Sequence, residues 1–456
     1  MTAARAVACG SDTATLGSTS QPWDVLIVGA GVGGAALALA LVSHFDLRVC
    51  VIDRRSGPGN INRGDSLLPA VTGALRAWGA LPALLAAGAR PVQTLQVFHP
   101  QHGLLLEAPL SAPAEDDPQP APYLVLAHPD IERALVQTAK HGAHNRGRAQ
   151  VTYRSRFVHL LRAHGDRGRI CGARVHSEHG EQDIHARVVI GADGAASKVR
   201  SQLGLSLPTT PYDHSYYILE CARPSATSGR GAYHDAMRIE LSRHGGILVV
   251  PQGPDRLGLG VLVRAADSDL FRAGAQAEKL AAIAQRSPLL HSLGQPGGLA
   301  AYMQGAHLYA LHRGHAPHYH RDGSVLIGDA IHVTNPTAGQ GMTMAIEDAA
   351  ALARHLGPVL TTPRAASDSA RCDRDADLDR ALVAYQRERW PQNDAQIGWS
   401  HWLSRFYAWE GPLADRVHTQ IFRFGSSSLG QHIQRLIWSR LAMRAPLPTT
   451  PAWITP

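Results

Sequence analysis

The sequence predicts an α/β protein in which a parallel sheet is interleaved with a second, β-rich domain and followed by a helical region. Three observations lead to this prediction. A strand, a glycine-rich turn and a helix open the chain after residue 22, closely spaced apolar segments fill its middle, and segments of helical pattern close it. Because 456 residues exceed what one hydrophobic core usually serves, we expect more than one domain.

The opening element is a βαβ unit. Residues 23–28 form a short apolar run that stops at glycines and predicts a buried strand. The Ala- and Leu-rich stretch after Gly33 predicts a helix, and residues 48–53 predict a second strand. Such a unit implies parallel strands with a right-handed crossover. Residues 188–193 and 325–329 predict two more strands, which end at Gly-Asp or Asp-Gly pairs.

The turn of this unit is a GxGxxG sequence that predicts a dinucleotide site. It consists of Gly29, Gly31, Gly33 and Gly34, and Asp53 ends the second strand. Gly29 suits a tight turn, Gly31 lets the backbone approach a pyrophosphate, and Gly34 allows close packing of helix on strand. The helix N-terminus offers N–H groups to the phosphates, and Asp53 would accept hydrogen bonds from ribose hydroxyls. This pattern alone does not choose between FAD and NAD(P).

The middle of the chain predicts an antiparallel sheet. Its β-rich segments are closely spaced and separated by Gly and Pro; they are residues 215–220, 238–241, 246–250 and 257–263. We read them as a domain that covers the first sheet. Residues 364–379, which are rich in Ala, Asp and Arg, are expected to form a mobile surface loop.

These segments define the expected domains. A disordered tail spans residues 1–22, and a discontinuous nucleotide-binding domain spans residues 23–90, 123–205 and 319–390. The substrate domain spans residues 91–122 and 206–318, and the helical region spans residues 391–456.

Composition excludes several classes of function. The net charge is +7, but Arg and His are scattered without a basic block, so we expect no nucleic-acid partner. Five cysteines without a CxxC pair predict neither a metal site nor a disulfide framework, and they fit a reducing cytoplasm. No apolar run is long enough to cross a membrane, and the first 22 residues do not resemble a signal peptide.

The C-terminal region is rich in tryptophan. Six of the eight tryptophans lie from Trp390 onward: Trp390, Trp399, Trp402, Trp409, Trp438 and Trp453. They alternate with Phe and Arg in segments of helical pattern. One interpretation is a helical cap packed on the core. The alternative is an interfacial surface that contacts a lipophilic substrate or lies peripherally on a membrane.

Two downstream motifs resemble those of class A flavin monooxygenases. Residues 191–200, which include Asp193, resemble the family's DG motif, and residues 328–341, from Gly328-Asp329 through Pro336 to Gly341, resemble its GD motif. Residues 63–69 resemble the squalene-epoxidase-like and ubiquinone-hydroxylase-like branches, and residues 341–343 resemble the Gly-Met-Thr sequence of squalene epoxidases. The resemblance covers residues 22–390. His128 stands where family members commonly carry Arg or Gln.

The resemblance implies FAD, held by a Rossmann-like domain of the GR2 type. It implies that Asp329 forms hydrogen bonds with the ribityl chain and that Asp193 has a structural role rather than one in proton transfer. It also implies that the helix after Gly339 stabilises the reduced flavin. It also implies that Pro336 borders the oxygen pocket and that no protein nucleophile is needed. The cofactor-binding residues expected are Gly29, Gly31, Gly33, Gly34, Asp53, Arg54, Arg63, His128, Asp193, Asp329, Pro336, Gly339, Gln340, Gly341 and Met342.

The reaction implied is monooxygenation. NADPH or NADH would reduce the flavin, O2 would form a C4a-hydroperoxyflavin, and an apolar, aromatic or polycyclic small molecule would be hydroxylated or epoxidised. His214, Tyr216, Tyr217 and His234 lie in the expected substrate sheet, where we expect packed or solvated side chains rather than a base. The alternative is a flavin-dependent reductase of the geranylgeranyl-reductase type. Residues 399–402 do not match the Trp-x-Trp-x-Ile-Pro motif of flavin-dependent halogenases.

Overall fold

The computed structural model is described here for the well-placed parts of the chain. They are residues 22–59, 65–110, 121–163, 168–222, 236–252, 256–287, 306–362 and 368–431. Arg63, His234, Trp438 and Trp453 lie outside these ranges, as does most of the expected N-terminal tail.

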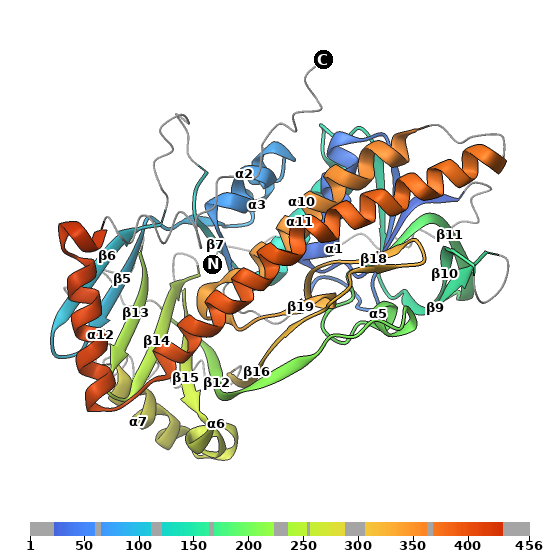
Figure 1. Ribbon diagram of the computed structural model, residues 1–456. Helices are drawn as coiled ribbons and strands as arrows, with labels where there is room; N and C mark the ends of the chain where they lie inside the picture. The colour runs from blue at the N-terminus through green and yellow to red at the C-terminus, as the bar shows by residue number, and fades with distance from the viewer. Residues whose placement is uncertain are drawn as a thin grey trace, which may run out of the picture.

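The first sheet is built on the predicted βαβ unit (Figure 1). Strand β1 (Trp23–Val28) lies between β2 (Arg48–Ile52) and β11 (Gly180–Gly191) and is parallel to both. Helix α1 (Val32–His44) makes the crossover and is almost entirely buried. The other strands are β8 (Arg148–Thr152), β9 (Arg156–Arg162), β10 (Ile170–Ser177), β17 (His320–Arg321) and β18 (Ser324–Leu326).

The second sheet has the order β19-β16-β12-β15-β14-β13-β5-β6. Only its β13–β5 pair is parallel. Its strands are β5 (Thr94–His99), β6 (Gly103–Pro109), β12 (Thr209–Ala222), β13 (Ala236–Ser242), β14 (Gly245–Pro251), β15 (Arg256–Arg264), β16 (His307–His315) and β19 (His332–Val333). The antiparallel middle domain that the spacing predicted is therefore present.

Shorter elements complete the fold. A small third sheet has the order β3-β7-β4, with strands β3 (Asp65–Leu67), β4 (Arg90–Pro91) and β7 (Leu124–Leu126). The shorter helices are α2 (Pro69–Ala77), α3 (Leu81–Ala86), α4 (His128–His141), α5 (Lys198–Gln202), α6 (Ser268–Ala273) and α7 (Gln276–Arg286).

Long helices cross between the sheets. Helix α10 (Gln340–Thr361) packs on α1, and α11 (Asp368–Ala408) runs along α10 and on to strands β14, β15 and β16. Figure 1 shows α11 spanning the molecule, with α12 (Pro412–Gly425) against strands β6 and β13 of the second sheet. The expected boundary at residue 390 therefore falls inside one continuous helix.

We expected residues 364–379 to form a surface loop. This prediction is wrong for residues 368–379, which form the first turns of α11. Of the polar side chains described there, those of Asp373 and Asp379 are exposed. Leu378, Leu382 and Tyr385 follow at helical spacing and are buried against the core, so tertiary packing holds the segment in a helix.

Candidate functional site

The GxGxxG glycines have different surroundings. A Cβ added at Gly29, whose φ is +110°, would lie 2.3 Å from the Ala192 carbonyl oxygen, and one at Gly34 would lie 2.0 Å from the Gly29 carbonyl oxygen. These two glycines therefore allow close packing of protein on protein. A Cβ at Gly31 would meet only Glu132 Oε1, at 3.8 Å. Gly31 is the N-cap residue of α1 and lines an open cavity, as a phosphate-binding turn requires.

Asp53 lies beneath this turn and is held by a neighbouring arginine. It accepts hydrogen bonds from the Ala30 amide at 2.8 Å and from Arg55 Nε at 3.0 Å and Nη2 at 2.9 Å. Burial alone would raise the pKa of Asp53, but these hydrogen bonds bring it below its ordinary value. Arg54, which we expected to contact cofactor, is exposed, and Arg55 makes the contacts to Asp53.

Arg55 also reaches a second carboxylate that the sequence analysis missed. Its Nη1 donates to Glu132 Oε2 at 3.0 Å, and the Gly59 amide donates to the same oxygen at 2.8 Å. His128 Nε2 lies 3.2 Å from Glu132 Oε1, one helical turn away on α4. His128 and Glu132 both line the cavity. The histidine that stands here in place of the family's Arg or Gln therefore has an acidic partner.

The DG motif is a structural junction. Asp193 accepts hydrogen bonds from the Ser197 hydroxyl and from the amides of Lys198 and Val199, at 2.7 and 3.2 Å, and so caps α5. Arg200 Nη1 donates to the Ala330 carbonyl oxygen at 2.8 Å, and its Nη2 donates to that of Ala195 at 2.7 Å. Arg200 thus ties the DG segment to the GD segment.

The GD motif is anchored by a buried carboxylate on α10. Asp329 lies in the 3₁₀ turn η4 (Gly328–Ala330) and lines the cavity. Beneath it, Asp348 Oδ2 accepts hydrogen bonds from the Gly328 amide at 3.1 Å and from His332 Nε2 at 2.8 Å. Asp348 Oδ1 accepts one from Arg389 Nε at 2.8 Å. Burial opposes ionisation of Asp348, but His332 and Arg389 hold its pKa well below the usual range.

The loop after the GD motif meets the second sheet and α11. Asn335 Nδ2 donates to the Tyr212 hydroxyl at 2.8 Å and to the Ser400 carbonyl oxygen at 3.0 Å. The hydroxyls of Tyr216 and Thr337 are 3.0 Å apart. Pro336 begins the 3₁₀ turn η5 (Pro336–Ala338), and Gly339 has a φ of +64°, a conformation that favours glycine. The N-terminus of α10 follows and faces the cavity.

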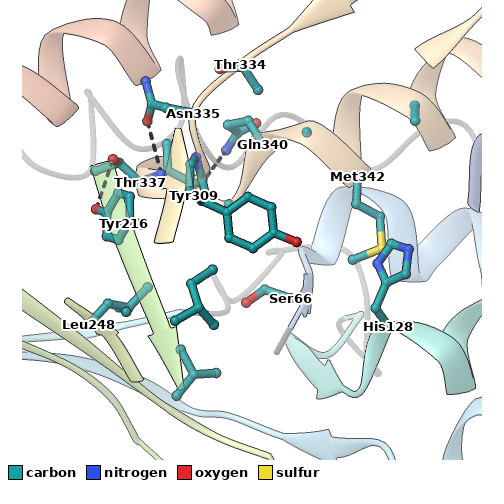
Figure 2. Close-up of a pocket in the computed structure, with 18 of the residues that line it drawn as sticks. Ser66, His128, Tyr216, Leu248, Tyr309, Thr334, Asn335, Thr337, Gln340 and Met342 are labelled. Atoms are coloured by element: carbon teal, nitrogen blue, oxygen red, sulfur yellow. Dashed lines mark hydrogen bonds between the residues drawn. The ribbon is translucent and has the colours of Figure 1, made fainter. Parts of the chain in front are cut away.

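One cavity of about 630 Å³ lies between the two sheets. Its cofactor-side lining includes these predicted residues: Gly31, Gly33, His128, Asp329, Pro336, Gly339, Gln340, Gly341 and Met342. Gly29, Gly34, Asp53 and Asp193 lie in or behind the surrounding turns and do not line it. The glycine turn before α1, the start of α4 and the GD motif are remote in sequence but line the same cavity. Figure 2 shows His128 and Met342 among the side chains that line it.

The opposite wall is apolar and includes residues that the sequence analysis did not assign to the site. Figure 2 shows the Tyr309 ring projecting into the cavity, with Tyr216 and Leu248 on the side of the second sheet. Helix α11 adds a further part of the wall, formed by Trp399, Leu403 and Tyr407. Their spacing of four residues, on one helical face, was the signal that could have found them.

Of the four residues considered as bases, His234 lies outside the described residues, and the other three lie in different places. His214 is buried behind the cavity, where its ring nitrogens lie 2.8 Å from Asp213 Oδ1 and 2.6 Å from the Ser404 hydroxyl. Tyr217 packs in the apolar cluster on the other face of the sheet. Tyr216 lines the cavity, but burial raises its pKa to about 12, so it is protonated at neutral pH. The described residues contain no group of three or more His, Cys, Asp or Glu side chains arranged to hold a metal ion.

Known proteins resemble the chain over most of its length. The family model described as FAD binding domain matches residues 22–381. The kynurenine 3-monooxygenase of Stenotrophomonas maltophilia (strain K279a) is 30% identical over 439 residues, which are 90% of this chain and 83% of that protein. The 3-demethoxyubiquinol 3-hydroxylase of Escherichia coli (strain K12) is 29% identical, covering 73% of this chain and 79% of that protein.

Solved structures share the fold. Pseudomonas aeruginosa PqsL in complex with 2-aminobenzoylacetate has a TM-score of 0.69 and 26% identity, with coverage of 85% of this chain and 97% of that chain. The p-nitrophenol 4-monooxygenase PnpA of Pseudomonas putida DLL-E4 has a TM-score of 0.71 at 18% identity, covering 93% and 99% of the two chains, and supports the fold alone. The relatives are monooxygenases and hydroxylases and give no support to the reductase alternative.

Proposed function

Since the chain belongs to the class A flavin monooxygenases, we propose that it inserts one oxygen atom into an apolar, aromatic or polycyclic small molecule. The protein is an FAD-dependent monooxygenase, and NAD(P)H is its reductant. Bound FAD accepts hydride from NAD(P)H and activates O2. The observation that supports the substrate proposal is a cavity that has the predicted cofactor motifs on one side and an apolar sheet on the other.

The residues present fit FAD. The N-terminus of α1 at Gly31 offers backbone N–H groups to the pyrophosphate, and the room at Gly31 permits close approach. Asp329 would accept hydrogen bonds from ribityl hydroxyls. The N-terminus of α10, from Gly339 to Met342, would place its positive dipole end beside the flavin ring and favour the reduced anion.

The roles left to the chain's own residues are binding, orientation and exclusion of water. Pro336 and its 3₁₀ turn border the space beside the flavin, where oxygen must react, and Asn335 holds this turn to α11. The aromatic and aliphatic side chains opposite would orient a ring-containing substrate and keep the site dry. Hydroxylation and epoxidation place the same demands on these residues.

A screen of ring compounds with the FAD-loaded protein tests the proposal. A substrate should accelerate NAD(P)H oxidation, with O2 consumed in equal amount and little hydrogen peroxide released. The Asp329→Ala variant tests the cofactor site separately. It should bind FAD more weakly by about 1–3 kcal/mol, because it lacks a hydrogen-bond acceptor. Unchanged FAD affinity in this variant would remove Asp329 from the cofactor site.

A second proposal concerns location: we infer that the protein is cytoplasmic and lies peripherally on anionic membranes through α12. The exposed side of α12 and the end of α11 carry large apolar side chains: Trp402, Trp409, Leu413, Ile421 and Phe424. Arg405, Arg416 and Arg423 are also exposed there. Apolar side chains flanked by arginine suit an interface with acidic lipid headgroups. Within the described residues, no helix is long and apolar enough to cross a membrane.

Vesicle co-sedimentation tests this location. Truncation near Trp390 would remove a wall of the cavity, so substitution is the better perturbation. Leu413→Ser combined with Phe424→Ser should reduce binding to phosphatidylserine vesicles, while Val383→Ser, an exposed apolar residue elsewhere on α11, should not. Equal binding of all three proteins, or none by the unaltered protein, would contradict membrane contact and leave only the capping role.

A further inference from the structure

Among the described residues that line the cavity, histidine is the only side chain that could carry a positive charge. Neither lysine nor arginine lines it within the parts of the chain that the structure describes. Its carboxylates are Glu132 and Asp329, and its histidines are His128 and His312. The carboxylates and His128 belong to the cofactor side, and His312 is exposed. Glu132 is already ion-paired with Arg55, which does not line the cavity.

Strand alternation keeps charge on the other face of the second sheet. On β13, Met237 and Ile239 line the cavity, while Arg238 and Glu240 between and beside them do not. The Arg238 guanidinium lies 4.0 Å from the centre of the Phe98 ring and donates to Gln96 Oε1 at 3.0 Å. The sheet thus buries charged residues, but it directs them away from the cavity.

Apart from these carboxylates and histidines, the lining offers neutral hydroxyls and amides. Burial raises the pKa of Tyr123 and of Tyr216 to about 12, and it raises that of Tyr407 as well. All three therefore stay protonated at neutral pH. Gln252 adds an amide to the same lining. Such groups form hydrogen bonds with a hydroxyl or carbonyl, but they do not neutralise a carboxylate.

We propose that the cavity selects uncharged ring compounds and rejects those that carry a free carboxylate. This inference rests on the proposed function and narrows its substrate class. A carboxylate loses its hydration on entry and finds neither lysine nor arginine to pair with among the described lining residues. PqsL, by contrast, has been crystallised with 2-aminobenzoylacetate, which is a carboxylate. The substrate of this chain instead presents hydroxyl, ether, ester, amide or hydrocarbon groups to the second sheet.

Matched pairs of compounds test the proposal by binding alone. The probes are 3-hydroxybenzoic acid with its methyl ester, and 2-naphthoic acid with methyl 2-naphthoate. Both acids are ionised at pH 8. Binding is followed by the change in flavin absorbance of the FAD-loaded protein and by tryptophan fluorescence, since Trp399 lines the cavity. Each ester should bind at least about tenfold more tightly than its acid. An acid that binds as tightly as its ester, or a set in which no ester binds, overturns the proposal.

A pair of variants at Leu248 gives a second test. Leu248 lines the cavity from β14 and is only partly buried, so a longer polar side chain has room to extend. Leu248→Arg should shift the ester-to-acid preference at least about tenfold toward the acid, and Leu248→Gln should leave it unchanged. A folded, FAD-loaded Leu248→Arg protein with the original preference contradicts the inference. Failure of bound esters to support oxygen transfer would instead contradict the proposed function, because the preference is read without turnover.

Discussion

Replacing Gly31 by valine should weaken FAD binding at least about 100-fold without unfolding the protein. A Cβ at Gly31 meets no protein atom closer than 3.8 Å, and its backbone angles of −65° and 179° suit any residue. We therefore expect a folding cost below about 1 kcal/mol. The valine side chain would stand between the N-terminus of α1 and the pyrophosphate. Losing two charge-assisted hydrogen bonds of about 1.5–3 kcal/mol each weakens FAD binding by roughly 10²- to 10⁴-fold.

The assay separates folding from binding. Apoprotein is titrated with FAD by fluorescence, and the Tm of the apoprotein is measured by circular dichroism. Gly31→Ala should give an intermediate loss of affinity. Gly34→Val should instead lower the Tm, because its Cβ would lie 2.0 Å from the Gly29 carbonyl oxygen. A folded Gly31→Val protein that binds FAD as tightly as the unaltered protein would refute this account of the turn.

Three further changes test other parts of the structure. Asp348→Asn should lower the free energy of unfolding by about 3 kcal/mol in urea titrations, because it leaves buried Arg389 with one carboxylate partner fewer; an unchanged midpoint would contradict this. Glu388 has a pKa lowered to about 2, since Arg354 and His355 outweigh burial, so its stabilisation is present above its ordinary pKa and is lost as pH falls toward 2. Glu388→Gln should reduce the fall in the free energy of unfolding between pH 7 and pH 3 by at most about 2 kcal/mol. Gly260→Leu should weaken the binding of methyl 2-naphthoate at least about tenfold and leave FAD affinity unchanged. A Cβ at Gly260 lies 3.4 Å from the Tyr216 ring, so a larger side chain would fill the cavity. Unchanged ester binding would show that the ligand does not occupy this part of the cavity.

The sequence predicted those parts of the fold that local pattern determines. The βαβ unit, the antiparallel middle sheet and the helix after Gly339 all follow from apolar runs bounded by glycine. Residues 368–379 were assigned wrongly because their composition is mostly polar, and packing of Leu378 and the following turns against the core holds the segment in a helix. Tertiary contact overrode a compositional signal there.

The candidate site was predictable on its cofactor side and not on the other. Motif residues such as Asp329 and Gly341 line the cavity because their spacing encodes the turns that place them there. Arg55 could not be chosen over Arg54 from sequence, since only the path of the chain after β2 decides which side chain turns back to Asp53. Glu132 likewise depends on how α4 docks against that turn. The wall from α11 required the crossing of a long helix between two sheets.

Conversion of a neutral ring compound under 18O2 tests the central claim most directly. The FAD-loaded protein, supplied with NAD(P)H and a compound that it binds, should give a product heavier by one 18O atom, with one NAD(P)H oxidised for each product formed. No product should form without O2. A product that lacks 18O, or that forms equally well under anaerobic conditions, would contradict monooxygenation in this cavity.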